Sequence, residues 1–146
     1  TSPPFAENIK LIFKVSMNQH ADLLIFLLAV KDGETSFDAG LQRIPPFLEQ
    51  LGLDPDRVSL SDGRGNDYTD LFSPRTVAHL LQAMAMQPDF PAYFDALPIL
   101  GVDGSEADTV APTSPVRGKA VAKSGTTVAV EASHRPRRGF TYTSAG

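Results

Sequence analysis

The stretch Lys123-Ser124-Gly125-Thr126-Thr127 decides which fold and function this chain is expected to have. It follows residues 118–122, a short run of small and β-branched side chains that predicts a strand. At a strand end the lysine presents a cation, the hydroxyls of Ser124 and Thr126 stand beside it, and Gly125 lets a ligand lie against the backbone. Such a cradle suits a small carboxylate, and main-chain N–H groups near it can stabilise an oxyanion. An exposed strand end running into a polar turn is the alternative, and it is the commoner meaning of an isolated Lys-Ser-Gly.

Length and composition indicate one ordinary globular domain. The chain has 146 residues, of which 42% are hydrophobic and 21% charged, as in a typical single domain. Its net charge of −4 argues against a nucleic-acid partner. The sequence has no cysteine, which excludes a disulfide framework, a thiolate nucleophile and a cysteine metal site. His20, His79 and His134 lack the spacing of metal ligands, so no metal is expected.

Hydrophobic periodicity predicts a helical cluster followed by strands. An amphipathic helix follows Ser2-Pro3-Pro4 with Ser2 as its cap, and the apolar helix over residues 23–30 is expected to be buried in the middle of the domain. Residues 37–51 predict two short helices, or one helix kinked at Pro45-Pro46. Further predicted elements are a strand at 57–60, a loop at 61–67, helices starting at Ser73-Pro74 and spanning 89–96, a polar loop at 103–115, and an exposed turn at 134–139 between two final strands. The expected fold class is α+β, or α/β by a looser definition.

A second motif, Ser16-Met17-Asn18, interrupts the first two predicted helices. A hydroxyl and an amide two residues apart on a tight connection can both point into one cleft, facing the Lys123 strand across a groove. The alternative is that Ser16 or Asn18 caps the second helix, which is a common use of these residue types.

The two motifs, in this order, resemble a known enzyme family. Ser-x-Asn between helices and Lys-Thr/Ser-Gly on a strand are the second and third signatures of serine β-lactamases and penicillin-binding proteins. The surrounding sequence resembles the class C low-molecular-mass penicillin-binding proteins, the serine D-Ala-D-Ala carboxypeptidases/endopeptidases. The stretches that carry this resemblance are residues 14–18, 21–24, 60–65, 73–75, 97–104 and 118–126, so it covers roughly the whole chain. It implies a β-lactamase/transpeptidase-like fold in which a helical cluster packs on a mostly antiparallel sheet.

The resemblance implies a role for each motif residue. Ser16 would relay a proton toward the leaving amine, and Asn18 would hydrogen-bond the peptide carbonyl of the substrate. Lys123 would supply positive potential and support the proton path. Ser124 and Thr126, beside Gly125, would hold the terminal D-Ala carboxylate. The Thr126 N–H would form half of the oxyanion hole.

Three departures from the family pattern qualify this interpretation. The first signature, Ser-x-x-Lys, carries the nucleophile and is absent from the sequence, because no lysine has Ser or Thr three residues before it. The Asp-Gly-Ser-Gly loop of the family has Arg64 in place of its serine, and Tyr68 stands near the place of a common basic residue, which bears on side-chain preference. Residues 128–138 do not follow the family closely.

The resemblance therefore predicts the C-terminal part of a single penicillin-binding domain, incomplete at both ends and inactive alone. The parent protein would act on peptidoglycan peptides through an acyl-enzyme, with β-lactams as inhibitors, on the exported, cell-wall side of a bacterial membrane. No cofactor is implied. Two alternatives stay open: a non-catalytic peptidoglycan-binding relative that keeps the cradle, and a plain α+β interaction domain in which the motifs are a helix cap and a strand end.

Overall fold

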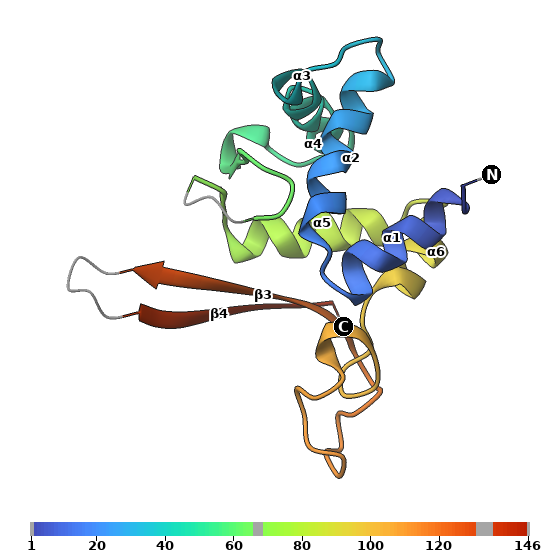
Figure 1. Cartoon of the computed structure of the whole chain (residues 1–146), viewed down its shortest axis with the longest axis vertical. Coiled ribbons are helices and arrows are strands. Elements are labelled where there is room, and N and C mark those ends of the chain that lie inside the picture. Colours follow the sequence, from blue (N-terminus) through green and yellow to red (C-terminus); the bar gives the residue numbers. More distant parts are fainter. Residues whose placement is uncertain (1, 66–68, 131–135, 146) are drawn as a thin grey trace.

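A cluster of helices leads into a long two-stranded antiparallel hairpin, which projects from the cluster in Figure 1. This computed structural model describes residues 2–65, 69–130 and 136–145, and their side chains as far as residue 125. The α-helices are α1 (Phe5–Lys14), α2 (Asn18–Val30), α3 (Phe37–Leu41), α4 (Ile44–Gln50), α5 (Pro74–Ala85) and α6 (Phe90–Ala96). The other elements are η1 (Pro55–Arg57), β1 (Val58–Ser59), β2 (Leu71–Phe72), η2 (Gly104–Glu106), β3 (Val121–Val130) and β4 (Pro136–Ala145). Helices with antiparallel strand pairs confirm the expected α+β class.

Local sequence signals account for most helix boundaries. The Ser73 hydroxyl accepts the Thr76 N–H at 3.1 Å, as the Ser-Pro start of α5 predicts. The helical segment of residues 37–51 is two helices, and Pro45 lies in the first turn of α4, where a missing N–H costs nothing. The start of α1 differs from expectation, because Pro4 is its N-cap and no side chain caps it. Ser2 is therefore not the cap that the sequence predicted.

The apolar helix α2 is less buried than its sequence predicts. Among its residues only Ile25 and Ala29 are buried, while Leu23, Leu27 and Val30 each expose more than half of their surface. In the part of the chain that the structure describes, α2 packs against α3 and α1 and keeps an apolar face without a partner. The expectation of a helix covered on all sides is therefore wrong for this chain, because hydrophobicity shows that a face seeks burial but not what covers it.

The hairpin corrects the expected place of the lysine motif. In the β3–β4 register Lys123 pairs with Thr143 and Gly125 with Thr141, so the motif lies within a ten-residue strand and not at a strand end. The turn predicted at residues 134–139 is also partly wrong, because the residues from Pro136 onward belong to β4. His134 and Arg135 lie outside the described residues.

The apolar segment at residues 98–100 lies beside the start of β3. The Ala122 N–H donates to the carbonyl of Pro98 at 3.0 Å, and the Leu100 N–H donates to that of Ala120 at 2.9 Å. These bonds give β3 a backbone neighbour on the edge away from β4, but only at its first residues. The buried side chains fall into two groups. One group comes from α2, α4 and the residues after α4: Ile25, Ala29, Leu48 and Leu53. The other lies where α1 and α6 meet β3: Ile12, Ala96, Leu97, Val121 and Ala122.

Candidate functional site

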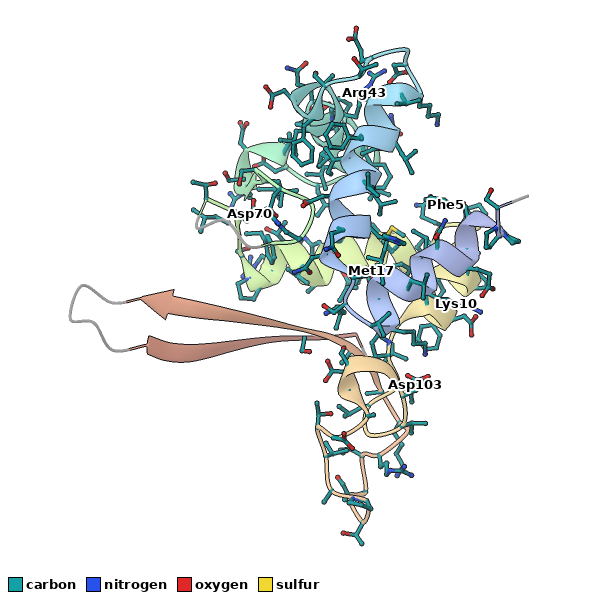
Figure 2. All side chains as sticks on the ribbon, viewed as in Figure 1. Phe5, Lys10, Met17, Arg43, Asp70 and Asp103 are labelled. Atoms are coloured by element: carbon teal, nitrogen blue, oxygen red, sulfur yellow. The ribbon has the colours of Figure 1, made fainter. Side chains whose placement is uncertain are left out.

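The Ser-x-Asn motif forms the turn between α1 and α2, where Figure 2 labels its middle residue, Met17. Ser16 has a left-handed backbone with φ of 57°, which costs a residue with a Cβ roughly 1–2 kcal/mol. Met17 is the N-cap of α2, makes no side-chain capping bond, and is followed by Asn18 as the first helical residue. The alternative that Ser16 or Asn18 caps the second helix is therefore wrong.

Both polar side chains of this turn are available to a ligand. The Ser16 hydroxyl and the Asn18 amide belong to exposed residues and form no hydrogen bond within the part of the chain that the structure describes. A strained backbone that carries unused polar groups is typical of functional turns.

Lys123 lies half-buried at the start of β3. It lines a small cavity of about 50 Å³ together with Phe13 from α1, Leu81 from α5 and Tyr93 from α6. We call this the Lys123 cavity. Burial lowers the pKa of Lys123 from its usual value, and the charge of Glu106 opposes that shift by raising the pKa. The ammonium donates a hydrogen bond to the carbonyl of Ser124, which keeps it at the motif.

The next residues of β3 leave the strand backbone accessible. Ser124 is partly buried, and its N–H donates to Oε1 of Glu106 at 3.1 Å. Gly125 is exposed, and a Cβ built on it meets no atom within 4 Å. A ligand can therefore approach the strand at Gly125 without a side chain in its path. The side chain of Thr126 lies outside the described residues.

The two motifs are connected through the turn that precedes β3. The ammonium of Lys14, two residues before Ser16, lies 2.6 Å from Oδ2 of Asp103, which Figure 2 labels below α1. A Cβ built on Gly104 would lie 2.5 Å from the carbonyl oxygen of Lys14, so backbone packs on backbone there. Ser16 and Asn18 do not line the Lys123 cavity; Phe13 is the residue of this region that does. Their alignment across a groove with Lys123 stays a prediction.

A third segment packs beside the Ser-x-Asn turn. Oδ1 of Asp22, in the second turn of α2, accepts the N–H of Gly63 at 3.0 Å, and its Oδ2 lies 3.3 Å from the guanidinium of Arg64. A Cβ on Gly63 would clash with the carbonyl oxygen of Ala21. The loop that resembles the family's Asp-Gly-Ser-Gly segment is therefore bonded to α2, the helix that begins with Asn18. Arg64, which replaces the serine of that segment, forms an ion pair with Asp22 of the same helix.

Two further features of the described residues bear on the kind of site. Among residues 2–65, 69–130 and 136–145, no three His, Asp or Glu side chains are grouped closely enough to hold a metal ion. None of the helices described is both long and apolar enough to cross a bilayer.

Comparison with known proteins identifies the family. A model of the D-Ala-D-Ala carboxypeptidase 3 (S13) family matches residues 1–134. The chain belongs to this family. Among curated S13-like relatives, it is 30% identical over 106 residues to D-alanyl-D-alanine carboxypeptidase DacB of Haemophilus influenzae, a match that covers 71% of this chain and 22% of the relative. It is also 30% identical over 138 residues to a D-alanyl-D-alanine carboxypeptidase of Actinomadura sp. strain R39, covering 90% of this chain and 26% of that protein.

The fold matches solved structures of penicillin-binding protein 4 from Haemophilus influenzae. The match to its complex with a novel β-lactam has a TM-score of 0.76 at 25% identity and covers 97% of this chain and 35% of that one. A second structure of the same protein gives a TM-score of 0.75 and covers 33% of that chain. The chain thus spans about a quarter of the length of its curated relatives, and the expected transpeptidase-like fold is confirmed.

Three acidic residues that organise the candidate site were not predicted. Asp22 was visible in the sequence as the only charge within an apolar helix, which could have indicated a partner. Asp103 and Glu106 stand in a polar loop, where an acidic residue is unremarkable. Only the packing of that loop against α1 and β3 shows that Asp103 is paired and that Glu106 is buried.

Proposed function

We propose that this chain supplies the second and third active-site motifs of a serine-type D-Ala-D-Ala carboxypeptidase/endopeptidase. The intact protein would cleave peptidoglycan stem peptides through an acyl-enzyme, and its nucleophile would come from a Ser-x-x-Lys segment outside this chain. The chain would form part of a single transpeptidase-like domain that works on the exported, cell-wall side of a bacterial membrane. Membership of the S13 family supports this reading, together with relatives named D-alanyl-D-alanine carboxypeptidase.

The observation that carries the proposal is that both motifs present polar groups that are available to a ligand. Ser16 and Asn18 present a hydroxyl and an amide that the fold does not employ. Lys123 presents a half-buried cation beside an open strand backbone at Gly125. A D-Ala-D-Ala peptide offers complementary groups, namely a carbonyl for Asn18, a leaving amine for Ser16 and a terminal carboxylate for the strand.

In this mechanism the chain stabilises charge and moves a proton. Lys123 and Ser16 would carry the proton toward the departing amine, because a cation near a hydroxyl keeps the hydroxyl a better donor. The N–H of Thr126 would stabilise the oxyanion, an interaction worth about 3–4 kcal/mol for one donor in a studied protease. Ser124 and Thr126 would hold the carboxylate. A β-lactam would enter the same place, as supported by the penicillin-binding protein 4 complex that this fold resembles.

The decisive experiment is labelling of the intact protein by a fluorescent penicillin. Stable labelling supports the peptidase, whereas a folded protein that takes no label would favour a non-catalytic peptidoglycan-binding relative. Lys123→Ala is expected to slow acylation roughly a hundredfold or more. Lys119→Ala, an exposed lysine four residues earlier, is the matched control and should leave the rate unchanged. Equal rates for the two variants would favour the plain interaction domain. The isolated 146-residue chain should hydrolyse no D-Ala-D-Ala peptide.

A further inference from the structure

Glu106, the last residue of η2, is a buried acid that is hydrogen-bonded to the lysine motif. It is 0% exposed, and its Oε1 accepts the Ser124 N–H at 3.1 Å and the Ser105 hydroxyl at 3.3 Å. Its Oε2 is buried and has no hydrogen-bond partner among the residues that the structure describes. An unpaired buried carboxyl oxygen costs free energy, and an apolar side chain of similar volume would avoid that cost. Stability alone therefore does not explain a glutamate here.

The carboxyl occupies a defined place on the open edge of β3. Successive N–H groups of an antiparallel strand point to alternate edges. On the edge away from β4, the Ala122 N–H is taken by the Pro98 carbonyl and the Ser124 N–H by Glu106. The next N–H on that edge is that of Thr126, the proposed oxyanion donor. With Glu106 bonded to Ser124, the N–H groups on this edge of β3 are occupied up to Ser124, and the proposed ligand would bind from Thr126 onward.

Glu106 is also the acid whose charge acts on Lys123, because its carboxyl is bonded to the N–H of the next residue, Ser124. Tyr93 from α6 is the other titratable group at the Lys123 cavity. Burial raises the pKa of the Tyr93 phenol, which favours its neutral form. On α1, Lys14 is already paired with Asp103. From β4, the register sets Thr143 opposite Lys123.

We propose that Glu106 is a positioning residue for the lysine motif, which fixes the Ser124 N–H by a hydrogen bond and supplies the counter-charge of the Lys123 ammonium. This rests on the proposed function, since it assigns a support to the same site. Its consequence is that Glu106 extends the range of pH over which Lys123 stays protonated. The carboxyl acts through Lys123 and Ser124 and does not touch the substrate.

Two variants separate the hydrogen bond from the charge. Glu106→Gln keeps an acceptor in place and removes the charge, whereas Glu106→Leu removes both and fills the buried space, which favours folding. Glu49→Gln, on the exposed side of α4, is the matched control. In the intact protein, hydrogen exchange of the Ser124 amide should be slow in the wild type and in Glu106→Gln, and faster in Glu106→Leu. Equal protection in all three proteins would overturn the hydrogen-bond role.

The charge is tested by the pH dependence of penicillin acylation. Both variants should move the alkaline limb to lower pH, and a shift of half a unit to one unit of pKa would lower the rate on that limb by up to roughly threefold to tenfold. A merely structural residue would lower the rate without moving the limb, and superimposable profiles of wild type and Glu106→Gln would overturn the counter-charge role.

A readout that needs no activity distinguishes this inference from the proposed function. Trace acetylation of lysines followed by mass spectrometry reports the pH at which each amine becomes reactive. The midpoint of Lys123 should fall in Glu106→Gln and stay unchanged in Glu49→Gln. If the wild type takes no penicillin, the proposed function fails, and the Lys123 midpoint alone decides the inference: an unchanged midpoint overturns it and a lowered one supports it.

Discussion

Lys14 and Asp103 are 89 residues apart in sequence, and their side chains meet at 2.6 Å. The pair joins the end of α1, which leads into Ser16, to the turn that leads into β3. Oδ1 of Asp103 also accepts the Ile99 N–H at 2.7 Å, so this one carboxylate fastens both sides of the connection. The relative position of the two motifs therefore depends on a partly exposed ion pair as well as on buried apolar contacts.

Breaking this pair should loosen the site more than it destabilises the fold. Lys14→Met keeps the apolar stem and loses the charge, so the free energy of unfolding is expected to fall by about 0.5–1 kcal/mol, as for partly exposed ion pairs. Asp103→Ala should cost more, because it also strands the Ile99 N–H. Chemical denaturation of the intact protein measures both. Asp95→Asn, which breaks the more exposed pair of Lys10 and Asp95, is the control and should cost less than either.

Acid should weaken the same connection. Partial burial raises the pKa of Asp103, but the Ile99 N–H and the Lys14 ammonium outweigh it and hold the pKa below its usual value. A carboxyl with a lowered pKa stabilises the fold above its unfolded pKa, and that contribution is lost as pH falls through the folded value. Thermal melts from pH 6 to pH 2 should therefore fall less steeply below about pH 4 for Asp103→Asn than for the wild type. Parallel curves would show that the carboxyl contributes nothing.

Ser16→Gly should trade activity for stability. A glycine adopts the left-handed φ of 57° without the Cβ penalty, so the free energy of unfolding should rise by up to about 1 kcal/mol. Loss of the hydroxyl should slow penicillin acylation, because the proposed proton relay is gone. Ser16→Ala is the matched variant, since it loses the hydroxyl and keeps the strain. A Ser16→Gly protein acylated at the wild-type rate would exclude Ser16 from the relay.

Gly125→Ala should harm binding and spare the fold. A Cβ at this position meets no protein atom within 4 Å, so the melting temperature should change little. A ligand lying along the strand would meet the new methyl group, and acylation should slow by about tenfold or more. Gly40→Ala is the contrasting variant, because its Cβ would clash with the carbonyl of Ile25 and should destabilise the protein by about 3 kcal/mol. Wild-type acylation by Gly125→Ala would argue that the ligand does not cross this strand.

Much of the candidate site could be predicted, since its residues are contiguous. The Lys-Ser-Gly run and the Ser-x-Asn turn are short motifs, and their chemistry can be inferred from consecutive residues without knowing what packs around them. Their supports were not predicted, because Lys14 with Asp103 and Glu106 with Ser124 are pairs between distant segments. The exposure of Leu23 and Leu27 on α2 was missed for a related reason: a hydrophobic pattern indicates that a face seeks burial and not what covers it.

The sequence by itself determined the order of the α-helices, the Ser-Pro start of α5 and the residues of both motifs, because these depend on local hydrogen bonds, side-chain shape and spacing along one segment. Only the tertiary structure decided that Lys123 lies inside a strand, that Asp103 fastens α1 to the approach of that strand, and that Glu106 is buried beneath it. Burial and long-range pairing determine which side chains near a site are charged and which of those charges are paired. They arise when segments far apart in sequence pack together, which no local pattern records.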